Sequence, residues 1–156
     1  QALSEVLPCP VVYKVTAKTN KEIADTVREA NYRPECAGII TWCHTFSPSK
    51  MWIDGLRDLQ KPWCHLATQY NVEIPNEEID MDFMNLNQAA HGDREHGFIA
   101  ARLRMPRKVI AGYWQDQDVQ DRIASCFGCT SRKKAASKMQ SISLSHNGRI
   151  QHCLIQ

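Results

Sequence analysis

The stretch that decides the fold is IDMDFMNLNQAAHGDREHGFIAARLRM, which runs from Ile79 to Met105. Its first apolar residues recur at helical spacing, so they share one face of a helix. These residues are Ile79, Phe83, Leu86 and Ala90. Asn76 is the expected N-cap, and the acidic Glu77 and Glu78 complement the helix dipole in the first turn. We predict a central helix with one apolar face and one polar face.

The polar face carries side chains that both donate and accept hydrogen bonds. They are Asn85, Asn87, Gln88 and His91, and a charged segment from 92 to 96 follows them. Such a face suits a polyhydroxylated small molecule. It is equally typical of a hydrated subunit interface, and the residues alone leave both interpretations open.

Composition indicates a single globular domain. The chain has 156 residues, of which 43% are hydrophobic and 23% charged, with a net charge of +2. Basic residues are scattered among acids, so no basic stripe favours nucleic acid. No apolar run has the length of a membrane span, and the first residues lack the pattern of a signal peptide. We therefore expect a cytoplasmic protein without membrane or nucleic-acid partners.

Seven cysteines are spread along the chain, and we expect them to be reduced. Cys126 and Cys129 form a C-x-x-C pair. A structural zinc ion normally needs four ligands, so we interpret this pair as two unrelated thiols.

Four apolar segments alternate with helical patterns. The expected strands cover residues 10–15, 37–42, 61–68 and 107–113. Helices are expected after a capping box at Thr19 and Glu22, after the N-cap Ser47 with Pro48, and after Asp116. Strands and helices that alternate at this spacing predict an α/β fold with a parallel sheet and helices on both faces.

The pattern fails after about Gly128. We divide the chain into a domain over residues 1–128 and a basic, polar tail over residues 129–156, with one hairpin expected around Asn147 and Gly148.

Ligands of open α/β sheets bind past the carboxyl ends of the strands. The loop residues expected to face such a crevice are His44, Thr45, Phe46, Gln69 and Tyr70. Neither G-x-G-x-x-G nor G-K-[ST] occurs, so nucleotide binding is not expected.

Four potential metal ligands lie close together in the sequence: His91, Asp93, Glu95 and His96. The two histidines are five residues apart, whereas helical residues that share a face are three or four apart. We therefore favour a charged helix bend over a metal site. Further candidates for function are explained better by packing in the core: Cys43, Met51, Trp52, Met81 and Met84.

Four collinear motifs resemble the N-terminal domain of bacterial L-arabinose isomerases. They are ANY at 30–32, CAGIITWCHTFSPSKMWIDGL at 36–56, IDMDFMNLNQAAHGDREHGFIAARLR at 79–104 and GYWQD at 112–116. The resemblance covers about residues 7–123 and leaves the tail unmatched. It implies an aldose–ketose isomerase that interconverts L-arabinose with L-ribulose and D-galactose with D-tagatose.

The resemblance also implies a flavodoxin-like domain, a manganese ion and trimers paired into hexamers. It places Gln88 and His91 at the rim of a neighbouring subunit's sugar pocket, with Phe46 close by. A second glycine is expected where Asp93 stands, which puts the local turn geometry in question. The family's catalytic and metal-binding residues lie in later domains, so we predict no catalytic residue and no metal ligand in this chain.

The first strand of the family's sheet has no counterpart in the sequence, and its slot is central in the order 2-1-3-4-5. The flanking strands would then pair with each other or with another segment, and the tail is a candidate for that segment. An altered reading frame is the alternative origin of the tail.

Three functions remain open. The first is a truncated or short form of the isomerase that retains the sugar-contacting residues and needs partner chains for catalysis. The second is a non-catalytic sugar-binding or oligomerisation module. The third is a compact metal-dependent isomerase that uses His91, Asp93, Glu95 and His96, and their spacing favours it least.

Overall fold

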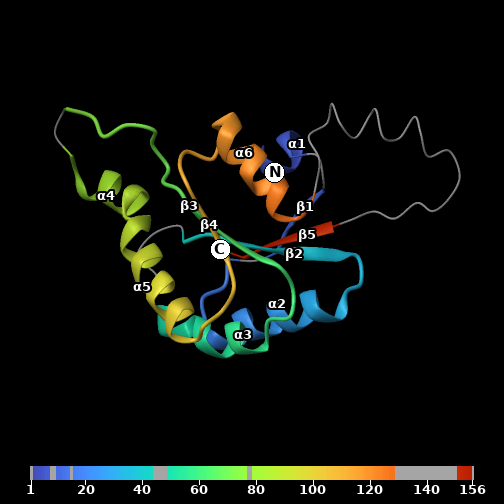
Figure 1. Ribbon diagram of the computed structural model, residues 1–156. Helices are drawn as coiled ribbons and strands as arrows, with labels where there is room; N and C mark the ends of the chain where they lie inside the picture. Colours follow the sequence, from blue (N-terminus) through green and yellow to red (C-terminus); the bar gives the residue numbers. More distant parts are fainter. Residues whose placement is uncertain are drawn as a thin grey trace, which may run out of the picture.

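The computed structural model describes residues 2–7, 10–14, 16–43, 49–76, 79–128 and 151–155. Strands alternate with helices along most of these residues (Figure 1). The elements are α1 (Ala2–Val6), β1 (Val11–Tyr13), α2 (Asn20–Tyr32), β2 (Cys36–Thr41), the 3₁₀ helix η1 (Ser49–Trp52), α3 (Ile53–Asp58), β3 (Trp63–Ala67), α4 (Met81–Asn87), α5 (Ala89–Arg102), β4 (Lys108–Ala111), α6 (Gln117–Cys126) and β5 (Gln151–Ile155).

The strands form one sheet in the order β1-β5-β2-β3-β4, and each neighbouring pair is parallel. Each of the four expected strands is present. The register places Thr41 of β2 beside His65 of β3, and Leu66 of β3 beside Ile110 of β4. The prediction of an α/β fold with a parallel sheet is confirmed.

β5 lies in the central position of the sheet, where the first strand of the family was expected to be missing. It pairs with β1 on one side, where His152 lies beside Val11. It pairs with β2 on the other side, where Cys153 lies beside Ile39. Of the two alternatives left open by the sequence, the structure shows the second, in which another segment lies between the flanking strands. The strand order is that of a flavodoxin-like sheet. The hairpin expected around Asn147 and Gly148 lies outside the described residues.

Helices cover both faces of the sheet. In Figure 1, α2, α3 and α5 lie on one side, while α1 and α6 lie on the other. Each side has its own apolar core, centred on Ile23, Trp52 and Ile99 in the first and on Leu66, Ile110 and Ile123 in the second. None of the helices in the described ranges has the length and apolar character that a membrane crossing requires.

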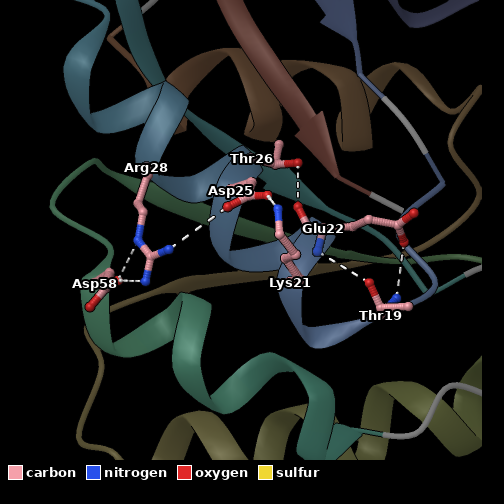
Figure 2. A network of polar contacts seen from close by, with 7 residues as sticks. All are labelled: Thr19, Lys21, Glu22, Asp25, Thr26, Arg28 and Asp58. Carbon is pink, nitrogen blue, oxygen red and sulfur yellow. Dashed lines mark hydrogen bonds and ion pairs between the residues drawn. The ribbon is translucent and has the colours of Figure 1, made fainter.

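The helix α2 begins at the predicted capping box (Figure 2). The Glu22 backbone N–H donates to Thr19 Oγ1 at 3.3 Å, and the Thr19 backbone N–H donates to Glu22 Oε2 at 3.0 Å. Arg28 then ties α2 to α3, because its Nε donates to Asp58 Oδ2 at 3.1 Å. A local sequence signal and one distant ion pair together fix the position of this helix.

The two other predicted helix starts have different outcomes. Asp116 is the N-cap residue of α6, as predicted, although its side chain makes no capping hydrogen bond in the described structure. Ser47 and Pro48 lie outside the described residues. The described chain resumes with η1, which leads directly into α3.

The central helix differs from the prediction in two ways. Its N-cap is Asp80, whose Oδ1 accepts from the Phe83 backbone N–H at 2.8 Å, so the choice of Asn76 was wrong. The helix also breaks at Gln88, where φ is −101° and ψ is 23°, and this break separates α4 from α5.

On the two sides of the break, only α5 has a buried face. α4 has no buried residue, and Ile79, Met81, Met84 and Leu86 are all exposed. The predicted packing of Met81 and Met84 in the core was therefore wrong. α5 buries a stripe at helical spacing instead. That stripe consists of Ala89, Gly92, His96, Ile99 and Ala100.

Candidate functional site

A cavity of about 340 Å³ lies where β3 and β4 end, beside α5. Ala67 and Gly112 mark the strand ends in its wall, and Gln69, Asp93 and Tyr113 supply polar groups. This is the edge of the sheet at which open α/β proteins bind ligands. The prediction that Gln69 faces a crevice is confirmed, whereas Tyr70 is 61% exposed and does not line the cavity.

Two of the predicted sugar-contacting residues, Gln88 and His91, do not line this cavity. Gln88 is half-buried at the break between α4 and α5, and its Nε2 donates to Asn85 Oδ1 at 3.1 Å. His91 is exposed on the first turn of α5. Phe46, like His44 and Thr45, falls outside the described residues. The structure thus brings Gln88 and His91 to one helix junction, and Ala90 between them lines the cavity.

Asp93 lies inside α5, so no turn occurs at this position, and its carboxylate points to the sheet. Its Oδ1 is 2.9 Å from His65 Nε2, and the two side chains are 15% and 3% exposed. A carboxylate only accepts hydrogen bonds, so His65 Nε2 is the protonated ring nitrogen and its N–H donates the hydrogen bond to Asp93. One helix residue is thereby connected to a buried histidine of β3.

The other nitrogen of His65 is held by a second buried chain of hydrogen bonds. Thr41 Oγ1 is 2.8 Å from His65 Nδ1 and also accepts from Trp63 Nε1 at 2.8 Å. An indole N–H is only a donor, so the Thr41 hydroxyl can turn its own hydrogen toward His65. Thr41 and Trp63, on the adjacent strands β2 and β3, therefore help Asp93 of α5 to fix the orientation of the imidazole.

His96 completes the wall around His65. The two rings are stacked with centroids 4.2 Å apart, while Trp52 and Trp63 contact His96 edge-on at 4.9 and 5.2 Å. Neither ring nitrogen of His96 has a hydrogen-bond partner in the described structure. Burial, and then the nearby His65 and Arg107, lower the pKa of His96 to about 2. The imidazole is therefore neutral and serves as an aromatic packing group.

Cys43, two residues beyond β2, brings a thiol to the same place. One ligand atom each from Cys43, His65 and Asp93 lies within 4.8 Å of the others. By contrast, His91 and Glu95 are exposed, whereas His96 is buried against the His65 ring. The four residues His91, Asp93, Glu95 and His96 therefore do not form one metal site. Sequence spacing missed Cys43 and His65, because only the register of β2 and β3 brings them to Asp93.

The three-residue set does not fit the manganese ion that the resemblance implies. Manganese is best served by carboxylate, carbonyl and water oxygens. Here one carboxylate stands beside a sulfur and a nitrogen donor.

Two thiols meet on the other face of the sheet, Cys64 from β3 and Cys126 from the end of α6. A hydrogen bond from Cys64, together with the charge of Lys108, lowers the pKa of Cys126 to about 7. The same hydrogen bond and burial raise the pKa of Cys64. Among the described cysteines, Cys36, Cys43, Cys64 and Cys126 form no disulfide, and the reduced state of all seven stays a prediction. The predicted independence of Cys126 from Cys129 stays a prediction, because Cys129 is outside the described residues.

Fold and site together define an α/β domain with a flavodoxin-like parallel sheet and a polar cavity at the carboxyl ends of its strands. The sequence comparisons narrow this class. Residues 2–138 match the family described as L-arabinose isomerase N-terminal domain, and the chain belongs to that family. This match extends at both ends beyond the motifs that carry the resemblance.

Similar curated proteins include the L-arabinose isomerase of Herpetosiphon aurantiacus, which is 62% identical over 122 residues, covering 78% of this chain and 24% of the relative. The L-arabinose isomerase of Thermotoga neapolitana is 58% identical over 119 residues, with 76% and 24% covered. The L-arabinose isomerase 1 of Clostridium acetobutylicum is 60% identical over 118 residues, with the same coverage. The chain thus spans about a quarter of the length of these relatives.

Proposed function

We propose that this chain is the sugar-contacting and assembly part of an aldose–ketose isomerase that converts L-arabinose to L-ribulose and D-galactose to D-tagatose. Membership of the family over residues 2–138 carries the proposal. Gln88 and His91 support it, because they lie close together at the junction of α4 and α5, where His91 is exposed and Gln88 half-buried.

In this proposal the chain binds and orients the sugar. The Gln88 amide and the His91 imidazole each offer hydrogen bonds to hydroxyl groups, and Phe46 adds an apolar contact. Isomerisation moves hydrogen between adjacent carbons, which requires a positioned base or a metal that polarises the sugar oxygens. We assign that chemistry to other segments or partner chains. Cys43, His65 and Asp93 do not suit a manganese ion, so they take no part in this chemistry.

The assembly role rests on α4 and the segment before it. Ile74, Met81 and Met84 are 66%, 65% and 49% exposed. Apolar side chains gathered in the open mark surfaces that bind another protein. We propose that a second copy of the chain covers α4, which would also bring Gln88 and His91 to a subunit boundary. Replacing Met81 and Met84 by Lys should reduce the mass measured by sedimentation to that of a monomer. An unchanged mass would exclude α4 from the interface.

The alternative is a non-catalytic sugar-binding or oligomerisation module. The exposed α4 favours it equally, since the apolar surface needs a partner but no chemistry. The two functions are separated by mixing the chain with the rest of an isomerase and assaying sugar conversion, with and without added manganese. Conversion in either mixture favours the first function. Sugar binding without conversion in both mixtures favours the module.

Sugar binding itself is tested by calorimetry with L-arabinose. Gln88→Ala and His91→Ala should each weaken affinity about 5- to 30-fold, the loss expected for one or two hydrogen bonds. Glu95→Ala, which changes an exposed residue of the same helix, is the matched control and should bind normally. Equal affinities for all four proteins would reject Gln88 and His91 as sugar contacts.

A further inference from the structure

Three potential metal ligands converge from three separate elements. Cys43 follows β2, His65 belongs to β3 and Asp93 belongs to α5. Their ligand atoms lie within 4.8 Å of one another, and Cys43 and His65 are only 1% and 2% exposed. The parallel register and the packing of α5 on the sheet produce this convergence, which no local motif encodes.

We propose that Cys43, His65 and Asp93 form a binding site for a divalent cation of the zinc class. A thiolate, an imidazole and a carboxylate are the three donor types that zinc uses in proteins. The site goes beyond the proposed sugar-contacting role, because neither Gln88 nor His91 takes part in it. Its donor set also separates it from a manganese site.

The hydrogen bonds around His65 already select the coordinating nitrogen. Nδ1 faces Thr41 Oγ1 at 2.8 Å, so Nε2 is the atom that faces Asp93 Oδ1 at 2.9 Å. In a tetrahedral zinc site with bonds of about 2.0–2.1 Å, neighbouring nitrogen and oxygen ligands lie about 3.3 Å apart. A few tenths of an ångström of movement therefore admits an ion between these two atoms.

The protons balance when the ion binds. Cys43 releases its thiol proton to solvent, and the Nε2 proton of His65 gives way to one on Nδ1, where Thr41 Oγ1 accepts the hydrogen bond. Trp63 Nε1 donates a hydrogen bond to Thr41 Oγ1 at 2.8 Å and so fixes the position of this hydroxyl group. This outer layer orients the imidazole, as partners of metal-bound histidines commonly do.

Charge and access also favour a cation here. The thiolate and the carboxylate together carry two negative charges, which a divalent ion cancels, whereas two uncompensated charges would be costly among buried side chains. Asp93 also lines the 340 Å³ cavity. A water molecule or a small oxygen ligand from that cavity can take the fourth position of a three-ligand site.

The test is a cobalt titration of the reduced, chelator-treated full chain, followed by absorption spectroscopy. A thiolate-to-cobalt charge-transfer band with visible bands of tetrahedral cobalt should appear at one ion per chain, and zinc should displace it. Cys43→Ser should abolish the charge-transfer band. Asp93→Asn should retain the band and weaken affinity at least tenfold, about 1.4 kcal/mol.

Cys64→Ser and Cys126→Ser are matched controls, because they remove thiols on the other side of the sheet and should leave the spectrum unchanged. Three results would overturn the proposal: no thiolate band in the unaltered chain, a band that survives Cys43→Ser, or a band lost with Cys126→Ser instead. Asp93→Asn keeps the test decisive if Cys43→Ser does not fold, since unchanged cobalt affinity in this variant also rejects the site.

Discussion

α4 and α5 are neighbouring helices cut from one amphipathic stretch, yet they have opposite surroundings. α5 buries five residues, including Ile99 and Ala100, where it packs on η1 and β3, whereas α4 buries none. Both contain apolar residues at helical spacing. The difference arises at Gln88, where the backbone leaves helical geometry and α4 separates from the core. Periodicity thus identifies a helix and its apolar side. Whether that side is buried or exposed depends on the direction in which the helix leaves the core.

The largest expected contrast between the two helices is in global stability. Ile99→Ala removes packing from a side chain that is 7% exposed and should lower the free energy of unfolding by about 2–4 kcal/mol. In the dissociated chain, Met84→Ala should change it by no more than about 0.5 kcal/mol, since Met84 is 49% exposed there. Urea unfolding measures both values. Equal losses would mean that α4 is packed as firmly as α5.

A second contrast is pH dependence, which α5 should carry through His96. Its pKa falls from 6.5 to about 2 on folding, because burial disfavours the charged imidazole. The unfolded chain therefore binds this proton more readily, so stability is complete above pH 6.5 and declines as the pH falls toward 2. At pH 5 the loss should be about 2 kcal/mol.

This loss is measured by urea unfolding at several pH values with a chelator present. His96→Leu should flatten the acid side of the stability profile. His91→Gln alters an exposed histidine of the same helix and should leave the profile as it is. If His96→Leu retains the full acid dependence, the buried imidazole is not its source.

The smallest contrast concerns the start of α4. Asp80→Ala removes the side chain that accepts from the Phe83 N–H and should destabilise this helix by about 1 kcal/mol. Amide hydrogen exchange within α4 reports this local change, whereas global unfolding should barely register it. Asn76→Ala is the control and should not alter the exchange. The opposite ranking would restore Asn76 as the cap.

Much of the fold was predictable because its signals are local. The buried run that became β2 and the capping box at Thr19 specify their structures within a few residues. The approach of Cys43 and His65 to Asp93 was not predictable, since it depends on strand register and on the seating of α5. Gln69 was found because the carboxyl ends of parallel strands follow a general rule. The break at Gln88 escaped notice because Gln is an ordinary helix former.

The position of β5 has a consequence for biosynthesis. β1 and β2 lie on either side of β5 in the sheet, yet β2 ends at Thr41 and β5 begins only at Gln151. A ribosome therefore completes both neighbours long before the strand that joins them is translated. Until then two strand edges stand open to wrong partners, and closing so long a loop is slow. A nascent chain of this protein should thus depend on molecular chaperones until its last described strand has emerged.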